Sequence, residues 1–190
     1  MKRIAIFVSG RGSNFQSIYL KILEGDIPAK VCLVISNNAN CGAINFSVRN
    51  GIETLIINDT RIPSINEQED ILLNRLHKKE IDFIILAGYV KMIPKGVIKK
   101  YHQKIINIHP SLLPKHGGKG MYGMHIHKKV IDSNDKETGI TIHFVSKEYD
   151  SGEIIFQKKV IINQNDDASL IEKKVHNLEY EYYPKIIASL

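Results

Sequence analysis

The chain has few cysteines and no long apolar run. Cys32 and Cys41 are the only two among 190 residues, which excludes a disulfide framework and a four-thiolate zinc site. No apolar run approaches the roughly 18–20 residues that a membrane-crossing helix needs, and the first residues lack the pattern of a signal peptide. These absences predict a soluble, cytoplasmic protein with no membrane partner.

Arginine is also scarce, although the chain is basic. Only 5 of its 26 basic residues are arginine, and the formal net charge is +6. Surfaces that read nucleic acid usually rely on the bidentate guanidinium of arginine. We therefore expect small anionic substrates and no nucleic acid. The length and the 43% hydrophobic content predict one globular domain over 1–190.

Short apolar runs alternate with segments of helical periodicity through the first half of the chain. The runs, rich in branched residues, are 3–8, 31–35, 54–57, 81–87 and 104–108. Unbroken apolar strands separated by helices are typical of a parallel sheet covered on both faces. Two later runs, 138–145 and 154–162, flank a turn, and a helix is expected from about residue 167. The prediction is an α/β fold with a doubly wound, mostly parallel, Rossmann-like sheet and an antiparallel late strand pair.

A glycine-rich turn, Ser9–Asn14 (SGRGSN), follows the first apolar run. Such a turn between a strand and a helix directs backbone N–H groups and the positive end of the helix at one place, which favours a phosphate. The turn is neither a Walker A loop nor a complete dinucleotide motif. A plain turn with a helix cap is the alternative interpretation.

Polar residues lie within and directly after the run 104–108. Asn107 and His109 are two residues apart on the expected strand, so their side chains share a face, at the carboxyl end where α/β sheets bind ligands. An amide donor beside an imidazole can polarise a carbonyl and transfer a proton. Asp150, between the two late strands, would raise the pKa of a nearby histidine. Taken singly, each of these also fits a strand end or an ordinary turn.

Other chemistry-bearing residues favour structural interpretations. His125 and His127 have no acidic or thiolate partner at a metal-ligand spacing, and they fit the start of a helix next to solvent. Cys32 fits a small core residue, and Ser111 lacks the setting of a serine nucleophile. No metal site is predicted.

Four segments in this order carry a family resemblance: Ser9–Asn14, Leu86–Tyr89 (LAGY), Asn107–Pro114 (NIHPSLLP) and the pair His143-Phe144-Val145 with Asp150-Ser151-Gly152. The set resembles the folate-dependent phosphoribosylglycinamide formyltransferases of purine synthesis, in their stand-alone bacterial form. The resemblance spans essentially the whole chain. It implies the formyltransferase fold, with a phosphate-binding N-terminal half and a folate-binding, catalytic C-terminal half.

The resemblance implies that the amine of glycinamide ribonucleotide attacks the formyl carbon of 10-formyltetrahydrofolate, and that tetrahydrofolate leaves. Asn107 would stabilise the oxyanion, His109 would act as the general acid and Asp150 would keep the pKa of His109 up. Neither step needs a metal or a covalent enzyme intermediate.

The resemblance also implies binding residues. Those for the ribonucleotide are Gly12, Ser13, Asn14 and Glu179; those for the folate are Val90, Lys91, Met92, Ile93, Asn107 and His143. Glu179 would contact the glycinamide portion, and a solvated helix charge is its alternative interpretation.

Two departures concern the folate site. Ser64-Ile65-Asn66 stands where many relatives have an arginine, and Lys115–Met124 is a longer, glycine-rich loop. The rivals are a formyltetrahydrofolate hydrolase, methionyl-tRNA formyltransferase and a non-catalytic phosphate-binding module. We expect neither the N-terminal regulatory domain of the first nor the C-terminal RNA-binding domain of the second, and the third does not explain Asn107, His109 and Asp150. The sequence leaves the oligomeric state open.

Overall fold

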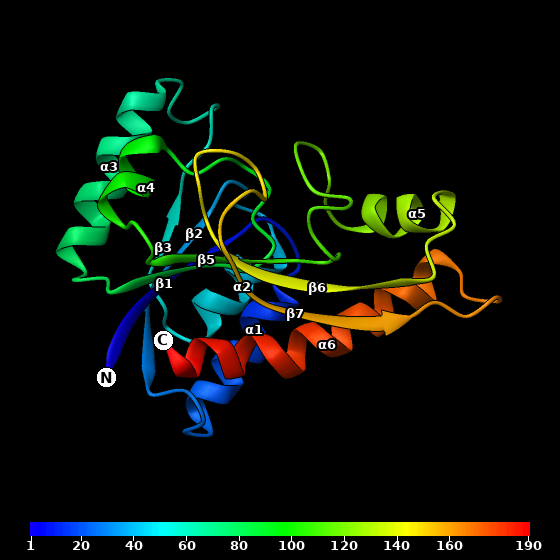
Figure 1. Ribbon diagram of the computed structural model, residues 1–190. Coiled ribbons are helices and arrows are strands. Elements are labelled where there is room, and N and C mark those ends of the chain that lie inside the picture. The colour runs from blue at the N-terminus through cyan, green and yellow to red at the C-terminus, as the bar shows by residue number, and fades with distance from the viewer. The chain divides into compact units, whose positions relative to one another are not determined.

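A computed structural model describes residues 1–190 (Figure 1). Seven strands hydrogen-bond in the order β3-β2-β1-β4-β5-β6-β7. The chain forms two compact units, Met1–Ile106 and Asn107–Leu190, and the boundary between them falls within β5 (Ile105–His109).

The first unit is a parallel α/β layer structure. Its other elements are, in chain order, β1 (Lys2–Val8), α1 (Ser13–Leu23), β2 (Ala29–Ser36), α2 (Gly42–Arg49), β3 (Thr54–Ile56), α3 (Ile65–Lys78), β4 (Phe83–Leu86) and α4 (Lys95–Lys100). β1 pairs in parallel with β2 and β4, and β2 pairs in parallel with β3. α1 packs on α2 and α3 on α4, and the two pairs cover opposite faces of these strands (Figure 1). The doubly wound arrangement is confirmed.

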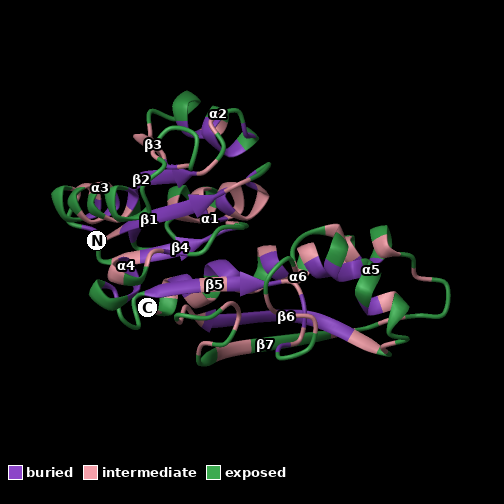
Figure 2. Ribbon diagram, turned by 90° about the horizontal axis from the view of Figure 1, so that it is seen from above, coloured by how far each residue is buried: buried purple, intermediate pink, exposed green.

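β1, β2 and β4 are largely buried because their sequences are apolar on both faces. Ile4 to Val8 of β1 are at most 2% exposed, and the same strand is uniformly coloured as buried over its second half in Figure 2. Removing such aliphatic side chains from water contributes about 1.5–3 kcal/mol each. This layer therefore supplies a rigid base for the loops that follow β1 and β4.

β4 is shorter than the apolar run 81–87 predicts. Glu80 adopts φ 49°, and the amide of Ile81 donates back to the carbonyl of Leu76 at 3.1 Å. Such a bond closes the C-terminus of a helix. Ile81 thus belongs to the end of α3, and β4 begins two residues later.

The second unit contains the antiparallel strand pair. Its elements after β5 are α5 (Met124–Asp132), β6 (Glu137–Phe144), β7 (Ile154–Ile161) and α6 (Ala168–Ser189). β6 and β7 pair antiparallel with a register shift between Ile142 and His143, which confirms the predicted late pair. α6 packs on α5, β6 and β7. None of the helices in the protein combines the length and the apolarity needed to cross a membrane.

Candidate functional site

In the first unit, the turn after β1 is bonded to the segment after β4. The Ser9 amide donates to the Gly88 carbonyl at 3.1 Å, and the Val90 amide donates to Ser9 Oγ at 3.0 Å. Ser9 Oγ in turn donates to Asn37 Oδ1 at 2.5 Å. The carboxyl ends of β1, β2 and β4 are therefore held together, as expected for the ligand-binding edge of an α/β sheet.

Gly12 leads this turn into α1. It has φ 81°, and a Cβ atom there would lie 2.6 Å from Cβ of Ala43, so the turn requires glycine at this position. As the N-cap residue, Gly12 offers no side-chain cap to the first turn of α1, which begins with Ser13 and Asn14. A helix N-terminus of this kind favours an anion through its N–H groups and its dipole.

The four residues expected to bind folate from this unit differ in exposure. Val90 and Met92 are each 37% exposed, whereas Ile93 is only 2% exposed and contributes to the core. Lys91 Nζ lies 3.6 Å from Asp59 Oδ2. Two apolar side chains thus remain open beside the Ser9 turn, and Ile93 offers a ligand only its backbone.

In the second unit, Asn107 lies against His143. Asn107 Nδ2 is 3.1 Å from His143 Nε2, and His143 Nδ1 is 2.8 Å from the carbonyl oxygen of Phe144. A carbonyl only accepts, so Nδ1 of His143 carries a proton, and whenever the ring is neutral its Nε2 accepts from the Asn107 amide. This contact fixes which end of the amide faces the histidine, and the second N–H of Asn107 points elsewhere.

His109 is the buried centre of the group. It is 3% exposed, its Nε2 donates to the carbonyl of His116 at 2.9 Å, and its Nδ1 is 3.5 Å from Asp150 Oδ1. Burial lowers its pKa below the ordinary value, and the opposing charge of Asp150 only partly offsets this. Asp150 thus raises the pKa of His109 in the expected sense, but burial outweighs this effect and the net pKa is lowered.

Asp150 completes the group from the loop between β6 and β7. Its Oδ1 is also 3.7 Å from His143 Nε2, and its Oδ2 accepts the Gly118 amide at 2.9 Å. Burial raises its pKa, but His143, His109 and the Gly118 amide lower it by more, so the net pKa lies below the ordinary value. The structure thus brings Asn107, His109, His143 and Asp150 together around one ionised carboxylate.

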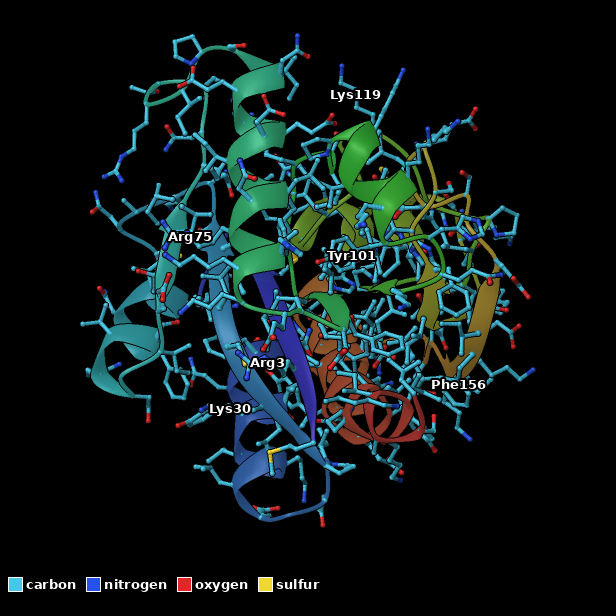
Figure 3. All side chains as sticks on the ribbon, turned by 90° about the vertical axis from the view of Figure 1, so that its left-hand side faces the viewer. Arg3, Lys30, Arg75, Tyr101, Lys119 and Phe156 are labelled. Carbon is cyan, nitrogen blue, oxygen red and sulfur yellow. The ribbon has the colours of Figure 1, made fainter.

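Several supporting residues carry no sequence signal. Thr141 Oγ1 donates to the Ser111 carbonyl at 2.7 Å and accepts the Leu113 amide at 3.0 Å. Gln157 Nε2 donates to the Leu113 carbonyl at 3.0 Å. Ser111 Oγ itself donates to the Lys115 carbonyl at 2.7 Å. These bonds fix the base of the loop before α5, whose exposed Lys119 extends away from the ribbon (Figure 3).

Two further predicted residues lie near α6. Glu179 is 4% exposed and its Oε2 lies 3.8 Å from His176 Nε2, so the solvated-charge interpretation is wrong. His125 is exposed, but His127 is 1% exposed, which corrects the expectation of a solvent-facing pair. The side chain of His127 therefore faces the interior and not water. No group of three or more metal-ligating side chains is present in the structure.

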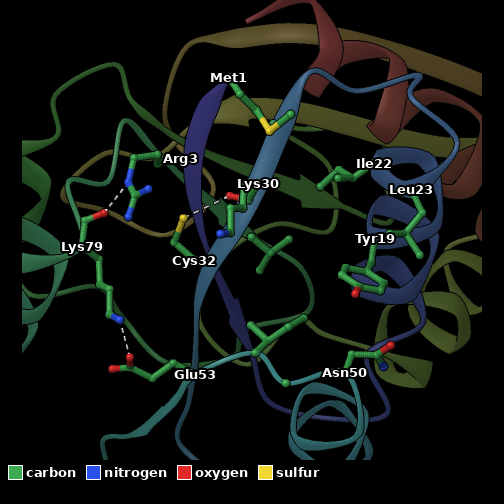
Figure 4. A pocket seen from close by; sticks show the side chains of 14 residues that line it. Met1, Arg3, Tyr19, Ile22, Leu23, Lys30, Cys32, Asn50, Glu53 and Lys79 are labelled. Carbon is green, nitrogen blue, oxygen red and sulfur yellow. Dashed lines mark hydrogen bonds and ion pairs between the residues drawn. The ribbon is translucent and has the colours of Figure 1, made fainter.

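A hollow of about 490 Å³ lies elsewhere in the first unit (Figure 4). Its lining includes Met1, Arg3, Lys30, Cys32, Glu53 and Lys79. Arg3 and Lys30 stand near the amino ends of β1 and β2, whereas the Ser9 turn follows the carboxyl end of β1. This hollow is therefore separate from the turn that the sequence singles out.

The group around Asp150 is suited to acyl transfer. An amide N–H donor can stabilise an oxyanion, an imidazole can move a proton, and a carboxylate can stabilise the imidazolium. Neither a nucleophilic serine nor a thiolate belongs to the group, since Ser111 is bonded to the backbone and Cys32 and Cys41 lie in the first unit. A direct attack of substrate on substrate is the chemistry that these residues fit.

Comparisons with known proteins agree with this chemistry. The model of the formyl transferase family matches residues 2–187. Phosphoribosylglycinamide formyltransferase of Haemophilus influenzae is 36% identical over 98% of this chain and 86% of its own length. The chloroplastic enzyme of that name from Arabidopsis thaliana is 38% identical over the whole chain, which spans only 65% of the plant protein.

A solved structure gives the same result. Glycinamide ribonucleotide transformylase 1 of Geobacillus kaustophilus superposes with a TM-score of 0.92 at 34% identity, covering 100% of this chain and 98% of that one. With sequence, fold and site geometry in agreement, the chain belongs to the formyl transferase family, among the phosphoribosylglycinamide formyltransferases.

Proposed function

We propose that the protein transfers the formyl group of 10-formyltetrahydrofolate to the amine of glycinamide ribonucleotide, giving formylglycinamide ribonucleotide and tetrahydrofolate. The observation that carries this proposal is the buried group of Asn107, His109, His143 and Asp150. The formyl group is a weak electrophile, which an N–H donor to its oxygen activates. The folate nitrogen is a poor leaving group, which a proton delivered by an imidazole assists.

In the proposed mechanism, the amine nitrogen attacks the formyl carbon and the carbonyl oxygen becomes an oxyanion. The Asn107 N–H that does not face His143 donates to that oxyanion. The bond from the formyl carbon to N10 of the folate then breaks, and its electron pair goes to N10. The amine loses one proton and N10 gains one, so no proton is consumed overall.

His109 is the group that carries this proton. Its lowered pKa keeps the resting imidazole neutral, ready to accept a proton as the amine attacks. Asp150, ionised and 3.5 Å from Nδ1, stabilises the imidazolium until the proton passes to N10 as the general-acid step. The cycle returns His109 to its neutral form.

We assign substrate binding by position. Gly12, Ser13 and Asn14 hold the phosphate at the start of α1, and the buried Glu179 contacts the glycinamide portion. Val90 and Met92 contribute apolar contacts to the folate, Lys91 and Ile93 contribute backbone groups, and Asn107 and His143 contact its formyl end. Residues 1–190 act as a single functional domain in this proposal.

The proposed partners are these small molecules, and nucleic acid is not among them. The proposed compartment is the cytoplasm, where the two free cysteines stay reduced. Subcellular fractionation tests the compartment, and a gel-shift assay with RNA tests the partner.

The decisive experiment measures release of tetrahydrofolate from 10-formyltetrahydrofolate with and without glycinamide ribonucleotide. The proposal expects release only when the ribonucleotide is present. Release without it would identify a hydrolase, and binding of the ribonucleotide with no release would identify a binding module. Either result overturns the proposal.

A further inference from the structure

The loop between β5 and α5 touches His109 through one backbone atom. The carbonyl oxygen of His116 accepts the Nε2–H of His109 at 2.9 Å. His116 adopts φ 54°, a left-handed backbone conformation that residues other than glycine rarely adopt. A residue in that conformation needs other contacts to hold it there.

Asp135 supplies such a contact from the turn between α5 and β6. Its Oδ2 lies 2.8 Å from His116 Nε2, and its Oδ1 accepts from Lys115 Nζ at 3.2 Å. The side chains of His116 and Asp135 are only 10% and 13% exposed. The hydrogen bond from His116 holds the pKa of Asp135 below its ordinary value, so the carboxylate is charged at neutral pH.

The carbonyl of His116 decides how His109 is protonated. Because a carbonyl cannot donate, Nε2 of His109 carries a proton in this arrangement. Nδ1 then faces Asp150 at 3.5 Å, and it is the nitrogen that gains and loses the second proton. The tautomer of a catalytic histidine is commonly set in this way, by the partner of its other ring nitrogen.

We propose that His116 and Asp135 are positioning residues: their side-chain contact holds the His116 carbonyl against Nε2 of His109, and this keeps Nδ1 turned toward Asp150. The expected effect on kcat rests on the proposed function. The tautomer of His109 is a property of the protein without substrate and can be measured independently.

The same loop reaches Asp150, which gives independent support. The Gly118 amide, two residues beyond His116, donates to Asp150 Oδ2 at 2.9 Å. The loop therefore contacts both residues through its backbone: the His116 carbonyl accepts from His109, and the Gly118 amide donates to Asp150. Its tip is not held in this way, since Lys119 is exposed and projects outward (Figure 3).

The remaining charged or titratable neighbours of His109 do not replace this contact. Asp150 faces it from the β6–β7 loop, His143 from β6, His116 from its own loop and His127 from α5. Of these, only the His116 backbone accepts a hydrogen bond from Nε2. Without it, a half-turn of the imidazole about its Cβ–Cγ bond would put the carbon Cδ2 in place of Nδ1 opposite Asp150.

The test compares Asp135→Ala with the conservative Asp135→Asn and with Lys115→Gln as a matched control. Lys115→Gln removes the other contact of Asp135 and leaves His116 in place. Long-range ¹H–¹⁵N NMR of the ¹⁵N-histidine-labelled protein reports the tautomer, and the signal missing from His109→Gln identifies His109 among the 8 histidines. Circular dichroism checks that each variant is folded. If Asp135→Ala does not fold, His116→Ala takes its place, because it removes the same side-chain contact.

In the wild type, we expect His109 to carry its proton on Nε2 when neutral. Asp135→Ala should mix the tautomers and lower kcat about 10- to 100-fold with little change in KM. It should also move the His109 ionisation to lower pH, because the His116 carbonyl raises that pKa. Asp135→Asn should restore most of the rate, and Lys115→Gln should behave as wild type.

An Nδ1-protonated neutral His109 in the wild type would overturn the inference, as would an Asp135→Ala variant with unchanged tautomer and pH profile. Absence of formyl transfer by the wild type would instead refute the proposed function, while the tautomer measurement would still decide the positioning role.

Discussion

Replacing Asp150 with asparagine removes one charge from the centre of the site with little change of shape. The new side chain can still accept the Gly118 amide that Asp150 binds at 2.9 Å. It no longer stabilises a proton on His109, whose Nδ1 lies 3.5 Å away. At an effective dielectric constant of about 20, a charge pair at that distance is worth about 5 kcal/mol as an upper bound.

This magnitude sets the expected loss of rate. Solvent and relaxation reduce the interaction, so we expect about 3–4 kcal/mol to be lost from the stability of the imidazolium. At about 1.4 kcal/mol for each factor of ten, kcat should fall about 10²- to 10³-fold. The His109 ionisation should move to lower pH, because the Asp150 charge raises that pKa.

Initial rates of tetrahydrofolate release across pH measure kcat, and NMR titration of labelled histidine measures the ionisation. Asp132→Asn, at an exposed acid near the end of α5, is the matched control and should leave both unchanged. An Asp150→Asn enzyme that keeps its rate and the His109 ionisation of the wild type would refute the role assigned to the carboxylate.

Three other substitutions test separate parts of the account. Asn107→Ala should lower kcat about 10²- to 10³-fold by removing the oxyanion donor; a steady-state kcat within a factor of two of wild type would contradict this. Gly12→Ala should cost about 1–3 kcal/mol of stability, because alanine is strained at φ 81° and meets Ala43, while Gly10→Ala, with open space around it, should melt as wild type. Burial lowers the pKa of His127 to about 4, below about 6.5 in the unfolded chain, so the unfolded state binds the proton first as pH falls. The free energy of unfolding of the wild type should therefore drop by up to ~3 kcal/mol between about pH 6.5 and pH 4. Urea unfolding at about pH 7 and pH 4.5 measures this loss, which should be smaller for His127→Leu. Equal losses in the two proteins would show that His127 does not titrate in this range.

The fold was predictable because its signals are local. Apolar runs of the first unit became parallel strands, most of them buried. The exception is Ile81, which sequence assigns to a strand because it is apolar. Its amide instead closes α3, and only the path of the chain after Glu80 decides between the two.

The sequence predicts a site residue only where a reactive side-chain type stands at an informative position, such as the end of a strand or a turn. Asn107 and His109 lie two residues apart on β5, and Asp150 lies in the turn between the two late strands, so their types and positions are informative. The contact between His116 and Asp135 joins residues 19 apart through a left-handed backbone that no local pattern indicates. The burial of Glu179 likewise depends on how α6 packs, because acidic and aromatic residues alternate around it without a clear polar face.

The central claim is direct transfer of the formyl group between the two substrates. It is tested most directly by a single turnover of 10-formyltetrahydrofolate carrying ¹³C in the formyl group, with glycinamide ribonucleotide and an excess of unlabelled formate. The account predicts that mass spectrometry finds the label in formylglycinamide ribonucleotide, undiluted by the formate. Label recovered as free formate, or a ribonucleotide that stays unformylated, would contradict it.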